Sequence, residues 1–261
     1  MFLNTYIPNP VAFTLFGIEI MWYGILIGAG MLLGAILLYI RAPKHKIKPN
    51  RVLDALIVCI PAGIVGARLY YVMFNWGSYG GDFFKMINIR LGGLAIHGGL
   101  IFGLLAALIF CGVCRIRPLN FFDLAAPAIA LAQSIGRWGN YFNSEAHGGP
   151  TNLPWAIPVH GQMVHPTFLY ESIWCFLLFI LLLALDNRRK FEGQIILLYG
   201  MLYSLERFFV EYLRTDSLMF GTLKQAQIMS AAIFILCLLF YLILGRTRKK
   251  RKKQNVRRNN R

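Results

Sequence analysis

Charge is scarce in this chain, and negative charge is scarcer still. Charged residues make up 15% of the 261 residues, and 27 Lys and Arg against 11 Asp and Glu give a formal net charge of +16. Soluble domains carry about 25% charged residues, whereas 57% of this sequence is hydrophobic. The composition therefore argues against an ordinary soluble enzyme and favours an integral membrane protein.

Cysteines in polar segments and a basic N-terminal segment are also missing. All five cysteines lie in or at the ends of apolar runs, so no disulfide framework is indicated. Cys111 and Cys114 have redox spacing, but they end an apolar segment and are interpreted as small apolar filler. No Lys or Arg precedes Phe16, so the basic start of a cleaved signal peptide is lacking. We therefore expect the first apolar run to remain as a membrane helix.

Long apolar runs are abundant, and a bilayer core needs about 20 mostly apolar residues per helix. The fourth run is short and contains Pro127, and it could extend through Arg137. The runs predict an all-α, polytopic membrane protein with about seven transmembrane helices, in a single transmembrane domain of residues 1–245. The expected spans are residues 16–40, 53–74, 91–113, 121–135, 168–185, 195–213 and 226–244.

The basic residues predict the orientation of these helices, because cytoplasmic loops carry the excess of Lys and Arg. The connectors after the first, third and fifth spans and the tail after the seventh hold five, two, three and ten basic residues, whereas the other connectors hold four in all. The N-terminus is therefore expected outside and the C-terminus in the cytoplasm. The tail, residues 246–261, is a charge block that we expect to be disordered and to lie against anionic lipid headgroups, with nucleic-acid binding as the less favoured alternative.

Ionisable and polar side chains inside the spans fall at one expected depth. Charged groups in a membrane are costly and usually face a functional interior. With the orientation above and a rise of 1.5 Å per residue, these side chains lie within roughly 10 Å of the outer surface. Arginine suits phosphate because its planar fork donates hydrogen bonds in pairs, so the layer predicts a site for a phospholipid headgroup. The alternative is a set of internal ion pairs that lock helices together. The layer consists of Tyr23, Arg68, His97, Arg137, Glu171, Arg207 and Glu211.

Two glycine-rich segments contribute to this layer. Residues 91–100 place His97 among glycines that permit close approach of a helix or a lipid. His97 is either a proton acceptor or a buried histidine that is hydrogen-bonded across helices. Residues 136–149 carry dense polar groups among glycines, which predicts a non-helical loop that lines a wet cavity, with a surface turn as the alternative.

The residues around these segments suggest further local roles. Thr167 is expected to cap the fifth span, and Asp123 is expected to favour the dipole at the start of its own helix. The three histidines of the outer connector lack metal-ligand spacing, so no metal site is predicted.

Taken together, the motifs resemble those of bacterial prolipoprotein diacylglyceryl transferases. The long match is specific, whereas each short match alone is weak. The matching segments are Gly136-Arg-Trp-Gly-Asn-Tyr-Phe-Asn-Ser-Glu145 with Gly148, Trp22-Tyr23-Gly24, His97-Gly98-Gly99-Leu100, His165-Pro166-Thr167, Tyr170-Glu171 and Arg207-Phe-Phe-Val-Glu211, in the family's order.

The resemblance implies a multi-pass enzyme of the bacterial cytoplasmic membrane with its active site toward the outer leaflet. Such an enzyme transfers the diacylglyceryl group from phosphatidylglycerol to the lipobox cysteine of a preprolipoprotein signal peptide. The products are a thioether and glycerol phosphate, and no cofactor is implied. The functional residues carried over by position are Tyr23, His97, Arg137, Asn140, Glu145, Gly148, Arg207 and Glu211.

This chemistry gives the residues expected roles. A thiolate is the nucleophile, so a base must remove the thiol proton; His97 is the expected base, with Glu145 or Glu211 as alternatives. Arg137 and Arg207 would hold the phosphate and offset the charge on the leaving oxygen.

Substrate binding is expected of a second set of residues. Tyr23 and Asn140 would fix the headgroup, and Arg68, Asn143 and Gly148 are also expected to bind substrate. Two other functions stay open: a transporter for an anionic solute, whose site would lie near the bilayer midplane, and a lipid-binding scaffold without catalysis.

Overall fold

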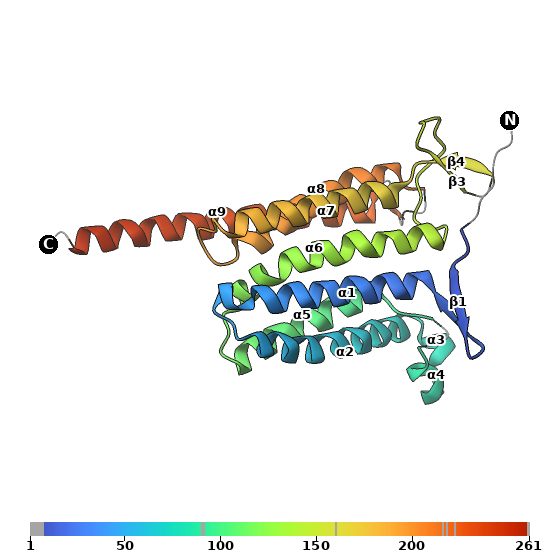
Figure 1. The fold of residues 1–261 in the computed structure, drawn as a ribbon, viewed down its shortest axis with the longest axis horizontal. Helices are drawn as coiled ribbons and strands as arrows, with labels where there is room; N and C mark the ends of the chain where they lie inside the picture. Colours follow the sequence, from blue (N-terminus) through green and yellow to red (C-terminus); the bar gives the residue numbers. More distant parts are fainter. Residues whose placement is uncertain are drawn as a thin grey trace. The chain divides into compact units, whose positions relative to one another are not determined.

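The computed structural model describes residues 8–89, 92–159, 161–215, 217, 219–221 and 223–259. The chain divides into two compact units, one formed by residues 1–37 with 122–261 and the other by residues 38–121. The chain passes between the units within two of its helices, α1 and α6 (Figure 1).

Most described residues are helical. The first unit contains β1 (Val11–Leu15), β2 (Ile18–Met21), most of α1 (Trp22–Arg41) and of α6 (Pro118–Phe142), β3 (Ile157–Val159), β4 (Gln162–Val164), α7 (Thr167–Asp186), α8 (Gln194–Leu213), β5 (Met219–Phe220), β6 (Leu223–Lys224) and α9 (Gln225–Asn259). The second unit contains the short 3-10 helix η1 (Ala42–His45), α2 (Pro49–Phe74), α3 (Trp76–Tyr79), α4 (Phe83–Ile87) and α5 (Ile96–Val113).

Within the described ranges, six helices are long and apolar enough to cross a bilayer, which supports a polytopic membrane protein. They are Trp22–His45, Pro49–Phe74, Ile96–Val113, Pro118–Phe142, Thr167–Asp186 and Gln225–Thr247. The remaining long helix, α8, has a comparable length but carries Glu206, Arg207 and Glu211, and it is not among the six. The predicted span at residues 195–213, and with it a total of seven transmembrane helices, therefore stays a prediction.

Neighbouring helices of the first unit run antiparallel, as their contacts show. Small residues bring α1 against α6, because a Cβ added at Gly30 would meet Ala132 and one added at Gly34 would meet Ala128. Figure 1 shows α7, α8 and α9 side by side. Along α8 and α9, Gly200 faces Cys237. Alternating directions bring the C-terminal ends of α6 and α8 to the same end of the unit as the N-terminal ends of α7 and α9.

A buried carboxylate fixes the start of α8. The side chain of Asp123 on α6 accepts hydrogen bonds from the backbone N–H groups of Gly193, Ile195 and Ile196 at 2.7, 2.8 and 3.0 Å. It also pairs with Arg189 at 2.9 Å. The sequence predicted that Asp123 favours the dipole at the start of its own helix. In the structure its carboxylate binds the free N–H groups at the N-terminus of α8, where it also favours the dipole of that helix.

The second unit is built on a glycine contact between α2 and α5. A Cβ added at Gly66 would overlap the Phe102 side chain and lie 2.7 Å from the carbonyl oxygen of Gly98. One added at Gly63 would lie 3.5 Å from the carbonyl oxygen of Gly99. Only glycines allow the two backbones to approach this closely. The prediction that glycines near His97 permit close helix approach is confirmed at Gly98 and Gly99.

Several predicted element boundaries differ from the structure. The first helix begins at Trp22 rather than residue 16, because β1 and β2 pair across a turn in which Phe16 and Gly17 both have positive φ, at 50° and 79°. Two positive φ values are typical of the tight turns that join hairpin strands. The apolar residues before Trp22 therefore belong to a hairpin and not to a membrane helix.

At the chain's other end, α9 continues through the basic tail to Asn259, a stretch for which the charge block predicted disorder. A helix that is already nucleated extends at little cost, and Lys and Arg are good helix formers. Cations near the C-terminus also favour the helix dipole.

Candidate active site

A buried carboxylate joins two arginines from different helices in the first unit. Oε2 of Glu171 on α7 lies 2.5 Å from Nη2 of Arg137 on α6, and Oε1 lies 2.9 Å from Nη1 of Arg207 on α8. Arg207 also pairs through Nη2 with Oε2 of Glu211 at 2.8 Å, one helical turn further along α8. The Glu171 and Glu211 side chains are 1% and 3% exposed, and both arginines are 20% exposed. We call Arg137, Glu171, Arg207 and Glu211 the Glu171 cluster.

The antiparallel order of α6, α7 and α8 explains why these four residues meet. Arg137 lies near the C-terminus of α6, Glu171 in the second turn of α7, and Arg207 and Glu211 near the C-terminus of α8. The structure thus brings these four members of the predicted layer together, while their depth in the membrane stays a prediction. The internal ion pairs, which the sequence left as the alternative, are present as well.

Polar contacts between helices keep the cluster in place. Nη2 of Arg137 donates a hydrogen bond to the hydroxyl of Tyr203, one turn before Arg207, at 3.1 Å. Next to the cluster, the Trp138 indole N–H donates to Oγ of Ser172 at 3.1 Å, and Ser172 donates in turn to the carbonyl oxygen of Ser134 at 2.8 Å. The first of these bonds links α6 to α8 and the other two link α6 to α7, so the guanidinium of Arg137 has little freedom to move.

One further buried carboxyl group, that of Glu206, lies beside the cluster. Glu206 is 6% exposed, and within the described part of the chain neither of its oxygens has a hydrogen-bond partner. It lies close enough to Arg137, Arg207 and Glu171 for electrostatic interaction with each of them. Sequence reasoning assigned Glu206 no role, because this residue neighbours Arg207 but lies on a different face of the helix.

The segment after Arg137 corrects a prediction. Residues 136–142 are the last turns of α6 rather than a loop, and the polar loop starts at Asn143. The aromatic side chains of these turns pack on neighbouring helices: Trp138 and Tyr141 contact Phe168, with ring centroids 5.4 and 5.2 Å apart. This packing outweighs the weak helix propensity of the glycines in the segment.

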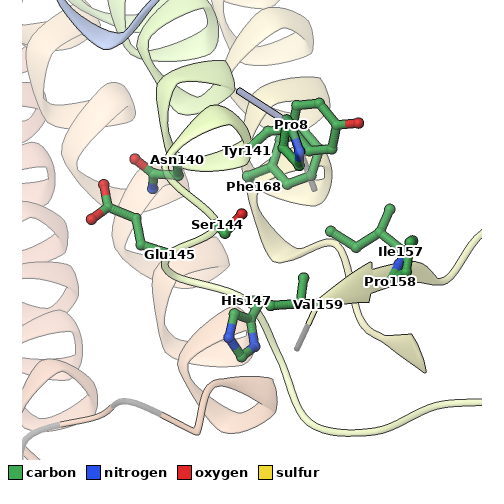
Figure 2. Close-up of a pocket in the computed structure, with 10 residues that line it drawn as sticks. All are labelled: Pro8, Asn140, Tyr141, Ser144, Glu145, His147, Ile157, Pro158, Val159 and Phe168. Atoms are coloured by element: carbon green, nitrogen blue, oxygen red, sulfur yellow. The ribbon is translucent and has the colours of Figure 1, made fainter. Parts of the chain in front are cut away.

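A small pocket lies where this loop leaves α6. Its volume is about 10 Å³, enough for roughly one water molecule. Figure 2 shows Asn140 from the last turn of α6 and Glu145 from the loop as neighbouring lining residues, with His147 further along. Nδ2 of Asn143 donates to Oε1 of Glu145 at 3.3 Å. The pocket thus contains Asn140 and Glu145 of the predicted site, with Asn143 attached to Glu145.

Two other predicted residues act through packing. A Cβ added at Gly148 would lie 2.7 Å from Cβ of His165 and 3.1 Å from the carbonyl oxygen of Leu213, so this glycine lets the loop cross the end of α8. The Tyr23 ring fills the space that a Cβ at Gly139 would need. Both residues border the predicted site, but their substrate contacts stay predictions.

Thr167 differs from its predicted role. Its hydroxyl donates to the carbonyl oxygen of Ala146 in the loop, and it makes no capping hydrogen bond to α7. The loop turns toward α7 with Ser144 and Ala146 at positive φ, 52° and 55°. This turn brings the Ala146 carbonyl within hydrogen-bonding reach of the Thr167 hydroxyl.

In the second unit, the guanidinium of Arg68 is bound to backbone carbonyl groups. Its guanidinium donates to the carbonyl oxygens of Lys85, Met86, Gly92 and Gly93 at 2.6, 2.7, 2.8 and 3.0 Å. It also lies 4.9 Å from the ring centroid of Tyr79. These bonds anchor α4 and the connector that follows it. The geometry favours the structural role of Arg68 over the predicted substrate contact.

His97 is exposed on the first turn of α5, and its ring centroid lies 6.2 Å from that of Tyr70. The alternative of a buried histidine is therefore wrong. His97 and the Glu171 cluster belong to different units, so the base role of His97 stays a prediction. Within the described residues, no three His, Cys, Asp or Glu side chains are grouped to hold a metal ion.

Sequence reasoning underrated three residues of this region. Glu171 was placed in the layer but not among the site residues, although a carboxylate inside an apolar helix was a sufficient signal. Arg214, which lies 3.9 Å from Glu171, and Lys224 were counted only as basic residues of connectors.

Comparison with known proteins gives a consistent picture. The family model described as prolipoprotein diacylglyceryl transferase matches residues 10–243. The chain is similar to proteins named phosphatidylglycerol–prolipoprotein diacylglyceryl transferase from several organisms. It is 54% identical to the protein of that name from Clostridioides difficile strain 630, and the match covers 85% of this chain and 90% of the relative. It is 51% identical to the one from Finegoldia magna, and that match covers 87% of this chain and 92% of the relative. A Clostridium perfringens protein of that name, numbered 1, is 45% identical over 94% and 98%.

Proposed function

Because the chain belongs to the prolipoprotein diacylglyceryl transferase family, we propose that its reaction takes place at the Glu171 cluster. The chain is a membrane transferase that catalyses the first step of lipoprotein maturation. The transporter and the scaffold without catalysis are therefore set aside. The observation that carries the placement of the site is the pair of guanidiniums bound to one buried carboxylate at the ends of three helices.

The donor substrate is phosphatidylglycerol, and the acceptor is the thiol of the lipobox cysteine of a preprolipoprotein. A base takes the proton from the thiol, and the thiolate attacks the glycerol carbon that bears the phosphate ester. The new C–S bond forms as the C–O bond breaks, and glycerol phosphate leaves with the electron pair. The nucleophile belongs to the substrate, so this chain needs no reactive cysteine of its own.

Arg137 and Arg207 bind the phosphate in this proposal. A guanidinium has five N–H donors. Within the described residues, the cluster's contacts engage Nη2 of Arg137 and both terminal nitrogens of Arg207. N–H donors of both guanidiniums therefore remain for a phosphodiester while Glu171 holds the two guanidiniums in place. Each donor aimed at the leaving oxygen would lower the barrier by about 3 kcal/mol.

The remaining predicted residues have supporting roles. Asn140, Asn143 and Glu145 line or border the pocket beside the loop and bind the polar headgroup. His97 is the preferred base over Glu211, because the carboxylate of Glu211 is buried and already paired with Arg207.

The membrane topology completes the proposal. We propose that α8 crosses the bilayer as a seventh helix, with its charged residues turned to the protein interior and its flanks covered by α7 and α9. The distribution of basic residues supports an outside N-terminus and a cytoplasmic C-terminus. The site would then face the outer leaflet of a bacterial cytoplasmic membrane.

A reconstituted transfer assay tests this function. The purified protein is mixed with phosphatidylglycerol and a lipobox peptide, and the peptide mass is followed. We expect a gain of one diacylglyceryl group, no product from a peptide with serine in place of cysteine, and none when phosphatidylethanolamine replaces phosphatidylglycerol. Lipid-independent modification of the peptide, or no product from folded protein, would contradict the proposal.

A further inference from the structure

The last turn of α8 ends against the side chain of Lys224. This residue closes the short strand β6, directly before α9 begins. Its Nζ atom donates to the carbonyl oxygens of Glu211, Arg214 and Tyr212 at 2.7, 2.6 and 3.3 Å. All three of the ammonium group's hydrogens can therefore be used on one short stretch of backbone.

These contacts supply hydrogen-bond donors and positive charge, which the C-terminal end of a helix lacks. The last four carbonyl groups of a helix have no partner inside the helix, and the C-terminus carries a partial negative charge. A cation satisfies both at once. Two backbone N–H groups also bind this end of α8: Gly149 donates to the Leu213 carbonyl at 2.9 Å, and Arg214 donates to the Glu211 carbonyl at 3.3 Å. Lys224 is thus a C-terminal cap supplied from another element.

The capped turn belongs to the Glu171 cluster. The residue whose carbonyl Lys224 binds, Glu211, pairs through its side chain with Arg207. Arg214, whose carbonyl is also bound, places its guanidinium 3.9 Å from Glu171. Movement of this turn would therefore shift the guanidinium of Arg207 relative to that of Arg137. In the described contacts, Lys224 itself touches neither Arg137 nor Arg207.

The opposite end of α8 is fixed in the same way, by Asp123 on its first backbone N–H groups. A negative side chain at the N-terminus and a positive one at the C-terminus both complement the helix dipole. Together they fix the position of α8 along its own axis. This matters because Tyr203 meets Arg137 on α6, and Arg207 meets Glu171 on α7, only in one register of α8.

We propose that Lys224 is a positioning residue for the transfer reaction, holding the end of α8 so that Arg207 and Glu211 keep their geometry around Glu171. The inference rests on the proposed function of the Glu171 cluster. It assigns Lys224 no contact with substrate. The ammonium acts through the backbone of the last turn of α8.

The test compares Lys224→Met, which removes every donor, with Lys224→Arg, which restores a cation with several donors. Hydrogen exchange of residues 211–214 and turnover are measured on each purified full-length protein. We expect faster exchange in this turn and a loss of turnover between about tenfold and a hundredfold for Lys224→Met, because small misplacements of catalytic groups are costly. Lys224→Arg should recover both properties.

Gln227→Ala is the matched control. Gln227 also links α9 to α8, by donating to the Phe208 carbonyl at 3.3 Å, but it does not reach the last turn. We expect normal turnover and normal exchange at residues 211–214 in this variant. If Lys224→Met does not fold, Lys224→Gln, which keeps a neutral donor, replaces it in both measurements.

The possible outcomes separate this inference from the proposed function. Three outcomes would overturn the role of Lys224. The first is normal turnover in folded Lys224→Met, and the second is lost turnover without faster hydrogen exchange at residues 211–214. The third is turnover that falls across the variants only in proportion to the fraction of folded protein. A wild-type protein that makes no product would overturn the proposed function, while the exchange data would still decide whether Lys224 holds the turn.

Discussion

Glu171→Gln is the substitution that most directly tests the cluster. The change keeps the shape of the side chain and removes its charge, leaving the guanidiniums of Arg137 and Arg207 without their shared carboxylate at 2.5 and 2.9 Å. Breaking a buried ion pair from one side costs about 3–5 kcal/mol. Both arginines are 20% exposed and keep some hydration, so we expect a loss of unfolding free energy of about 3 kcal/mol, the lower end of that range.

The same substitution should also lower the rate of catalysis in the protein that remains folded. Without Glu171 the two forks are no longer held at a fixed separation, and a misplacement of about 1 Å costs roughly a hundredfold in rate. We therefore expect turnover of Glu171→Gln to fall at least about a hundredfold under conditions where the protein stays folded. The assays are thermal unfolding in detergent and the reconstituted lipid transfer reaction.

Two comparisons make this test decisive. Glu171→Asp keeps the charge and should retain more activity than Glu171→Gln. Glu19→Gln removes an exposed carboxylate on β2 and should behave as wild type. If Glu171→Gln unfolds and turns over like wild type, the two ion pairs neither organise the site nor stabilise the fold, and the reasoning fails.

Three further predictions follow from the fold and the site. Asp123→Ala leaves the first N–H groups of α8 without their acceptor, so the unfolding free energy should fall by about 3 kcal/mol in a denaturant titration, and an unchanged midpoint would refute the capping role. Gly66→Ala should lower the thermal midpoint, because its Cβ would overlap Phe102, whereas Gly112→Ala, in open space, should not; equal midpoints would show that the helices separate freely. His97→Gln should lose turnover, and near-normal turnover across the pH range would transfer the base role to a carboxylate.

Much of this protein followed from its sequence because membrane insertion is governed by local composition. The apolar runs at residues 168–185 and 195–213 correspond to α7 and α8 within a residue or two at each end. A rise of 1.5 Å per residue then gave the depth of each ionisable group, which was enough to place Arg137, Glu171 and Arg207 together. The chemistry of phosphate binding could be inferred from these residue types alone.

Local sequence patterns led to wrong predictions where tertiary packing or strand pairing favoured a different structure. The glycines and polar residues of 136–142 are typical of a loop, yet Trp138 and Tyr141 pack on α7 and keep the segment helical. The residues before Trp22 were interpreted as helix because they are apolar, whereas pairing between β1 and β2 satisfies their backbone.

The choice of partners within the polar layer was decided by the tertiary structure. Depth along a helix does not specify its rotation or its neighbours, so Arg68 and Arg207 looked alike in the sequence. In the fold, Arg68 donates to four backbone carbonyls, while Arg207 faces two carboxylates. The contacts of Lys224 with the end of α8 likewise arise only because the connector folds back on that helix. Composition fixed which groups enter the membrane, and the packing of helices against one another decided which of them bind each other.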